Sequence, residues 1–303
     1  MVSYTVNEKL KVQSYQLAQR QSLPIECKVN LSLSRIKHWY DQWQGSVYVA
    51  FSGGKDSTVL LHLVRSLYKE VPAVFVDTGL EYPEIRQFVK STDNVICLKP
   101  AQSFKQTIDY YGYPLISKSV ADAVRRIRSP GCSQRTKDKA MYGDERGSYG
   151  KLPIKWRFLL DAPFKISDKC CDVMKMRPVQ KYYRQTGRVG IVGTMAADSN
   201  KRSAAYLKNG CFVMSKSLPK CTPLAFWKTD DIWEYIKGNN IDYCPIYDTG
   251  VKNTGCMFCM FGAHLEGSPN RFELMKKTHP KLYEYCIEKM GLSVPLDFAG
   301  IKY

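Results

Sequence analysis

The sequence has no run of apolar residues long enough to cross a bilayer, and residues 1–8 lack the basic and apolar regions of a signal peptide. It also lacks the Gly-x-x-x-x-Gly-Lys-Ser/Thr pattern of the common P-loop, which argues against kinase and GTPase chemistry. No internal repeat or low-complexity tract is present. We therefore expect a cytoplasmic protein without a membrane partner, and the sequence leaves its oligomeric state open.

The cysteine content points to thiol or metal chemistry. Eleven cysteines without a secretory signal argue against a disulfide framework. Two groups have close spacing, the adjacent Cys170-Cys171 and the Cys-x-x-Cys of Cys256 and Cys259. The others are single, and we expect them to be small core side chains or surface thiols: Cys27, Cys97, Cys132, Cys211, Cys221, Cys244 and Cys286.

Positive charge is in large excess. Lys and Arg outnumber Asp and Glu by 45 to 28, a formal charge of +17, which suggests a polyanionic partner, with nucleic acid as the leading candidate. Small phosphate-bearing substrates alone are the alternative. Residues 117–157 combine many cations with Tyr142, Tyr149 and Trp156, and they are either a nucleic-acid grip or a solvated insertion that covers the active site. The cations are Arg125, Arg126, Arg128, Arg135, Lys137, Lys139, Arg146, Lys151, Lys155 and Arg157.

Short apolar segments alternate with amphipathic ones. We predict strands at 46–51, 73–78, 94–99 and 188–194, and helices at 57–70, 82–91 and 268–290. This order predicts an α/β fold with a doubly wound parallel sheet, preceded by a helical segment, 1–45, and followed by a helical tail, 263–303. Ligands of such sheets bind beyond the carboxyl ends of the strands, where Ser52, Asp77 and Gly193 would converge.

A phosphate-binding loop is predicted directly after the first strand. Gly53 and Gly54 allow backbone amides to turn toward an anion, and the helix that follows adds its positive end. Lys55 supplies a cation, and Ser52 and Ser57 supply hydroxyl groups. An ordinary glycine turn is the alternative.

Several motifs occur in the order seen in the phosphoadenosine phosphosulfate (PAPS) reductase family, within the PP-loop ATP pyrophosphatase superfamily. The resemblance covers residues 46–262 and implies an adenine nucleotide alpha hydrolase-like fold, in which 117–157 is an insertion. The motifs are Ser52-Gly-Gly-Lys-Asp-Ser57, Val76-Asp-Thr-Gly79 with Glu81-Tyr-Pro-Glu84, Cys170-Cys171, Gly193 through Arg202, Pro223 through Trp233, and Gly255-Cys-Met-Phe-Cys259.

The resemblance implies roles for these residues. Residues 52–57 would hold the pyrophosphate of ATP, or the phosphate side of an adenylylsulfate-type nucleotide. Lys55 would neutralise developing charge and Asp56 would position water or Mg²⁺. Asp77, Thr78 and Gly79 would meet the adenosine side, and Gly193, Thr194 and the catalytic Arg202 would close the opposite wall.

The four closely spaced cysteines match the adenylylsulfate-reducing branch of this family. The resemblance implies that Cys170, Cys171, Cys256 and Cys259 ligate a 4Fe–4S cluster, which Lys175 would tune. Zinc or purely structural cysteines are the alternatives.

Two departures from the reductase pattern direct the functional hypothesis. The sequence has no C-terminal Glu-Cys-Gly, for which Cys286 between acidic neighbours is a poor replacement, and Met195 and Ala196 stand where reductases carry paired arginines. The hypothesis is ATP-dependent adenylation of a nucleic acid, tRNA or DNA, for sulfur transfer from a donor such as a cysteine desulfurase. The alternatives are a thioredoxin-dependent sulfonucleotide reductase and a non-enzymatic scaffold that carries the cluster and binds nucleotide and nucleic acid.

Overall fold

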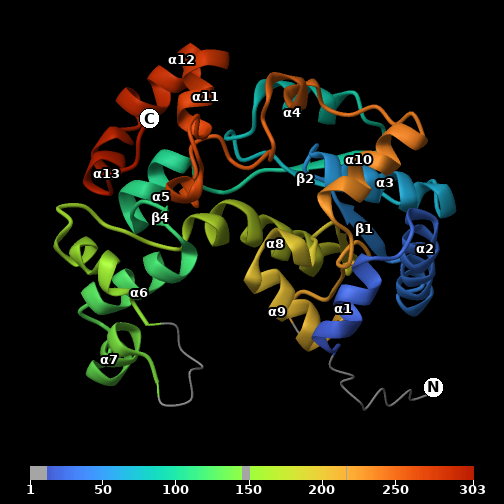
Figure 1. The fold of residues 1–303 in the computed structure, drawn as a ribbon, viewed down its shortest axis with the longest axis horizontal. Coiled ribbons are helices and arrows are strands. Elements are labelled where there is room, and N and C mark those ends of the chain that lie inside the picture. Colours follow the sequence, from blue (N-terminus) through green and yellow to red (C-terminus); the bar gives the residue numbers. More distant parts are fainter. Residues whose placement is uncertain (1–11, 145–150, 216) are drawn as a thin grey trace. The chain divides into compact units, whose positions relative to one another are not determined.

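The computed structural model describes residues 12–144, 151–215 and 217–303. The chain forms two compact units (Figure 1). Of the described residues, the sheet unit comprises 12–76, 83–98, 179–215 and 217–245, and the cysteine unit comprises 77–82, 99–144, 151–178 and 246–303. No helix in the described residues is both long and apolar enough to span a membrane.

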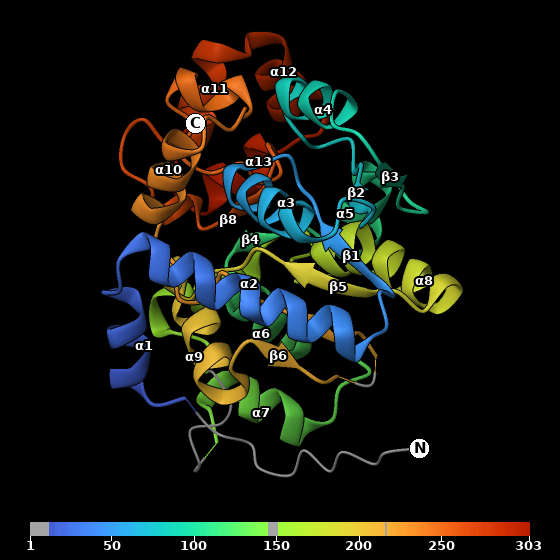
Figure 2. The ribbon, with the colours of Figure 1, turned by 90° about the vertical axis from the view of Figure 1, so that its right-hand side faces the viewer.

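A six-stranded sheet forms the centre of the sheet unit. Its order is β3-β2-β1-β5-β7-β6, and all neighbours are parallel except β6 and β7. The chain moves outward from β1 to β3 and then crosses to β5 on the other side of β1, which is the doubly wound arrangement. Figure 2 shows β1 and β5 side by side. The strands are β1 (Val47–Ala50), β2 (Ala73–Val76), β3 (Val95–Leu98), β5 (Val189–Val192), β6 (Phe212–Val213) and β7 (Lys220–Cys221). The predicted fold class is confirmed.

Helices cover both faces of this sheet. Side chains of a strand alternate between faces, so Tyr48 of β1 and Val74 of β2 form one apolar cluster with Tyr182 of α8. Helix α3 packs against β1, and α2 and α10 pack against α3. The helices of the unit are α1 (Ser14–Gln21), α2 (Ile25–Gln42), α3 (Lys55–Leu67), α4 (Pro83–Lys90), α8 (Arg177–Thr186), η3 (Ala196–Asp198), α9 (Asn200–Asn209) and α10 (Thr229–Gly238).

The cysteine unit is mainly helical. Its two short strands, β4 (Leu115–Ile116) and β8 (Met260–Phe261), pair in parallel. Ile116 is buried with φ of 64°, a conformation that is strained for a β-branched residue. The helices are α5 (Phe104–Tyr111), α6 (Lys118–Arg128), α7 (Gln134–Tyr142), η1 (Ile154–Asp161), η2 (Asp172–Met176), η4 (Pro245–Thr249), η5 (Ala263–Leu265), α11 (Arg271–Thr278), α12 (Pro280–Glu284), η6 (Tyr285–Lys289) and α13 (Ser293–Phe298).

The prediction of one helix over 268–290 is wrong. Asn270 caps α11, because its side chain accepts hydrogen bonds from the amides of Phe272 and Glu273. The helix then ends at Thr278, and Pro280 starts α12 because proline suits the first turn of a helix and not its interior.

Candidate functional site

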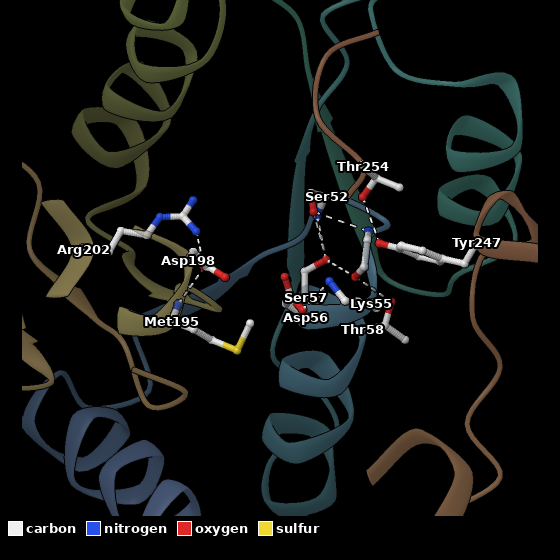
Figure 3. A network of polar contacts seen from close by, with 11 residues as sticks. Ser52, Lys55, Asp56, Ser57, Thr58, Met195, Asp198, Arg202, Tyr247 and Thr254 are labelled. Atoms are coloured by element: carbon white, nitrogen blue, oxygen red, sulfur yellow. Dashed lines mark hydrogen bonds and ion pairs between the residues drawn. The ribbon is translucent and has the colours of Figure 1, made fainter. Parts of the chain in front are cut away.

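The predicted phosphate cradle is an ordered turn between β1 and α3. Ser57 donates from Oγ to the Gly54 carbonyl (2.8 Å) and accepts from the Ser52 amide (3.1 Å). The hydroxyls of Ser52 and Ser57 are 3.1 Å apart. Figure 3 shows these side chains together at the start of α3, where unpaired helical amides and the helix dipole favour an anion.

Gly53 is required by the geometry of this turn. Its φ is +71°, and a Cβ at this position would lie 2.9 Å from Val89 Cγ2 and 3.0 Å from Ile85 Cγ2. Both contacts come from α4, so this helix presses against the cradle and fixes its path. Any larger residue must either move α4 or distort the loop.

The two charged residues of the cradle lie next to each other. Lys55 is only 3% exposed, and its Nζ lies 3.2 Å from Oδ1 of Asp56. Burial raises the pKa of Asp56, the Lys55 ammonium opposes that rise, and the carboxylate of Asp198 adds to it. The loop therefore holds a desolvated cation and carboxylate before any ligand is present.

The loop after β5 borders the cradle. A Cβ on Gly193 would lie 3.1 Å from the carbonyl oxygen of Asp56, so the ends of β1 and β5 meet here, as their adjacent strands require. Arg202 forms an ion pair with Asp198, whose carboxylate also accepts the amide of Met195 at 3.2 Å (Figure 3). Sequence reasoning did not identify Asp198. Its position four residues before Arg202 could have indicated this ion pair.

The segment after β2 leads toward the cysteines. Thr78 donates to Glu81 from its amide (3.0 Å) and from Oγ1 (2.7 Å), and Gly79 donates to Asp77 Oδ1 (3.1 Å). The carbonyl of Leu80 accepts the amide of Met257, inside the Cys-x-x-Cys, at 2.8 Å. The predicted adenosine-side residues thus belong to a turn that also contacts the thiol motif, and buried Glu81 is a second residue that sequence reasoning did not assign.

The four free thiols of Cys170, Cys171, Cys256 and Cys259 line one small cavity. Cys170 and Cys171 come just before the π-helix η2, and the Cys-x-x-Cys turn is closed by a 3.1 Å bond from the Cys259 amide to the Cys256 carbonyl. Short π-helical turns are frequent at functional sites. The other lining residues are Leu80, Phe104, Pro114, Met174, Lys175 and Phe261.

Burial and the neighbouring thiols raise the pKa values of Cys170, Cys256 and Cys259. Burial raises the pKa of Cys259 to about 11, and it also raises the pKa values of Cys170 and Cys256. Burial alone would lower the pKa of Lys175, but Cys256 and Glu81 raise it, so Lys175 stays a cation. It also hydrogen-bonds Cys256, and this positive charge suits a site for several thiolates.

The residue types of this cavity fit an iron–sulfur cluster. Its donors are four thiols, its other walls are largely apolar, and Lys175 offsets negative charge. The cavity measures about 20 Å³, which is room for about one water molecule, so its walls must separate to admit a cluster. Within residues 12–144, 151–215 and 217–303, no three His, Cys, Asp or Glu side chains are spaced to hold a single metal ion.

An arginine from α11 braces the Cys-x-x-Cys turn. Arg271 donates from Nη1 to the carbonyl of Cys259 at 3.0 Å. Its Nε and its amide each donate to Glu266 at 2.9 Å, so the guanidinium is held on two sides. The positive charge opposes the burial that raises the pKa of Cys259.

The position of Cys286 does not suit a nucleophile. It lies on the π-helix η6 with no exposed surface, and burial raises the pKa of its thiol. A reactive cysteine needs a lowered pKa and access to its substrate, and this one has neither.

A family model agrees with the arrangement of the motifs. The phosphoadenosine phosphosulfate reductase domain matches residues 46–128 and 139–261, which is more than half of the chain. The chain belongs to the PAPS reductase family. Both the cradle and all four paired cysteines lie inside the matched ranges, whereas Arg271 and Cys286 lie beyond them.

Relatives in this family differ in length and in name. An uncharacterized protein of Methanocaldococcus jannaschii, MJ0973, is 24% identical over 85% of this chain, which spans 51% of that protein. The chain thus spans about half the length of this relative. The adenosine 5'-phosphosulfate reductase of Anoxybacillus flavithermus is 23% identical over 90% of this chain and 98% of its own. The structure of the U34-tRNA thiolase NcsA of Methanococcus maripaludis, with its [4Fe-4S] cluster, is 15% identical and covers 89% of this chain and 80% of its own, at a TM-score of only 0.38.

Proposed function

We propose that this member of the PAPS reductase family is a PP-loop ATP pyrophosphatase-type enzyme. It adenylates an oxygen of a nucleic acid, tRNA or DNA. Sulfur from a donor such as a cysteine desulfurase then replaces that oxygen. The sites are the cradle of residues 52–57 and the cavity lined by Cys170, Cys171, Cys256 and Cys259. We place this reaction in the cytoplasm, where these thiols stay reduced.

The observation that carries this proposal is the carboxylate of Asp198 beside the cradle. Met195 and Ala196 are buried, and Asp198 neutralises Arg202. The loop therefore holds its arginine against a carboxylate near Asp56 and does not offer a set of free guanidinium groups. Carboxylates together with phosphates bind Mg²⁺, which supports Mg²⁺–ATP, whereas a sulfate group requires cations such as the arginine fork.

In the proposed step, the acceptor oxygen attacks the α-phosphorus of ATP. The bond from this phosphorus to the oxygen that bridges to the β-phosphate breaks, and pyrophosphate leaves with the electron pair. Lys55 and the amides at the start of α3 would stabilise the charge that develops on the leaving group. Mg²⁺ bound through Asp56 would shield the phosphates, and a sulfur nucleophile would then displace AMP.

The four cysteines would hold a 4Fe–4S cluster in this proposal. Such a cluster supplies an iron–sulfur surface that binds or carries sulfur. The chain's own part is to bury Cys170, to bring the four thiols to one cavity and to keep Lys175 charged beside them. Anaerobic purification followed by iron and sulfide analysis tests this part, and a colourless, iron-free protein would contradict it.

Pyrophosphate release from Mg²⁺–ATP is the direct test of the reaction. We expect release to increase when tRNA or DNA is added, and Asp198→Asn to reduce it more than tenfold. Asp109→Asn is the control, because Asp109 also pairs with a cation four residues away but in an exposed helix of the other unit. If neither nucleic acid stimulates release while nucleotide still binds, the scaffold alternative is favoured.

A sulfonucleotide reductase is the second candidate. It is supported by the similarity to the adenosine 5'-phosphosulfate reductase of Anoxybacillus flavithermus over 90% of this chain. Turnover of adenylylsulfate with thioredoxin and without ATP would establish it and refute the first proposal. The burial of Cys286 argues against that thiol as its nucleophile.

A further inference from the structure

Large apolar side chains are exposed on one part of the cysteine unit. Ile154 is 79% exposed, Leu265 is 78%, Tyr142 is 67% and Phe158 is 40%. Contacts connect them, because Trp156 touches both Phe158 and His264, the neighbour of Leu265, with ring centroids 6.1 and 5.1 Å apart. Exposed apolar groups that gather in this way usually mark a binding surface.

Two aromatic residues of this region, Tyr142 and the partly exposed Trp156, have a cation next to them. Lys155 Nζ lies 5.3 Å from the centre of the Trp156 ring, and the Arg157 guanidinium lies 5.7 Å from that of Tyr142. Neither cation forms an ion pair with a carboxylate of the described residues. We name the set formed by Tyr142, Ile154, Lys155, Trp156, Arg157, Phe158 and Leu265 the aromatic surface.

The basic residues of α6 differ from these cations. Arg125 and Arg126 pair with Asp122, and Arg125 also reaches Asp168 at 2.8 Å. Arg128 donates to the carbonyl of Phe164 at 2.7 Å. Among the residues that the structure describes, Arg125 and Arg126 of α6 are therefore paired with carboxylates, whereas Lys155 and Arg157 are not. Figure 1 shows α6 in the chain. Arg146 and Tyr149, which belong to the same prediction, lie outside the described residues.

We propose that the aromatic surface binds unpaired nucleotides of a single-stranded nucleic acid or an RNA loop. Exposed rings stack on the faces of bases, and cations beside them contact the adjoining phosphates. A duplex hides the faces of its bases and would leave Ile154, Trp156 and Leu265 in contact with water. This inference rests on the proposed function and narrows its acceptor to an unpaired strand.

The chain connects this surface to the thiol cavity. Phe261 lines the cavity, and His264, which packs against Trp156, comes three residues later. The amide of Gly262 between them is fixed by a 2.8 Å bond to the carbonyl of Ile116. A base stacked on Trp156 would therefore lie on a ring that packs against the segment that follows Cys259.

Binding of fluorescent oligonucleotides tests the proposal. The full chain is titrated against a single strand and against the duplex of the same sequence, at several salt concentrations. We expect the single strand to bind at least tenfold more tightly, and Tyr142→Ala to weaken it by roughly 5- to 100-fold, the range for loss of one base–aromatic stack. Tyr110→Ala is the matched control, because Tyr110 is 69% exposed in the same unit but outside the surface.

The outcomes separate this inference from the proposed function. Equal binding of duplex and single strand, or equal losses for Tyr142→Ala and Tyr110→Ala, would overturn the aromatic surface and leave a nucleic-acid acceptor possible. No binding of any nucleic acid would overturn both. If a second copy of the chain covers the surface, sedimentation would show self-association that Tyr142→Ala abolishes without changing oligonucleotide affinity, which would also refute the inference.

Discussion

Replacement of Gly53 by alanine isolates the contribution of the cradle's backbone. The new methyl group would meet Val89 and Ile85 at about 3 Å, at a φ of +71°. Gly187 provides a matched control, because its φ is +69° and a Cβ there would meet no atom within 4 Å. Both variants lose a flexible glycine from the unfolded chain and both strain the backbone, so these effects cancel in the comparison.

The expected magnitudes follow from this pairing. Left-handed φ costs a residue with a Cβ about 1–2 kcal/mol in both variants. Overpacking against Val89 and Ile85 adds about 1–3 kcal/mol in Gly53→Ala alone. We therefore expect Gly53→Ala to lower the free energy of unfolding by about 1–3 kcal/mol more than Gly187→Ala, which is a difference in Tm of roughly 2–12 °C.

Nucleotide binding is the functional assay for the same pair. Relief of the clash moves the Gly53 and Gly54 amides, so Gly53→Ala should lose ATP affinity by at least tenfold while Gly187→Ala keeps it. Isothermal titration with a non-hydrolysable ATP analogue measures the affinity, and urea unfolding measures the stability. Equal ATP affinities and equal stabilities of the two variants would refute the assignment of this turn as the phosphate cradle.

Two further predictions concern the cysteine unit. Arg271→Lys cannot keep both the bond to the Cys259 carbonyl and the contacts with Glu266, so we expect a reconstituted cluster to lose iron to a chelator several-fold faster than wild type, even where melting is unchanged. Arg128→Lys, which also removes a guanidinium bond to a carbonyl, should lose iron at the wild-type rate. Burial raises the pKa of Cys286 and keeps its thiol protonated, so iodoacetamide at pH 8 should label exposed Cys27 and not Cys286. Cys286→Ala should retain activity. Labelling of Cys286 in the native protein would contradict its inert role.

The sheet and the cradle were predictable because local sequence determines them. Short apolar runs between amphipathic segments placed β1, β2, β3 and β5 within one or two residues of their observed ends. Gly53 could be assigned to a special φ because glycine alone adopts it without strain. The alternation of strands and helices then indicated a doubly wound parallel sheet.

The long-range polar partners were not predictable. Asp198 and Glu81 lie within motifs of the sequence, but their electrostatic effects on Asp56 and Lys175 arise only in the folded chain. The same holds for α6, where Arg125 and Arg126 pair with Asp122 and Arg125 also pairs with Asp168, which lies 43 residues after it. Charge counted along a sequence overstates the cations that are free to bind a ligand.

The turn after β2 connects this strand of the sheet to a residue that lines the thiol cavity. Val76 is the last residue of β2, and Leu80, which lines the thiol cavity, follows four residues later. Between them, Thr78 is fixed by both oxygens of Glu81, so the turn is stiff, and its end is bonded to Met257 in the Cys-x-x-Cys. A short stiff turn transmits a displacement of its first residue to its last. Because Asp77, Thr78 and Gly79 are predicted to contact the nucleotide, we expect Glu81→Gln, which weakens the bonds that fix Thr78, to lower ATP affinity in isothermal titration.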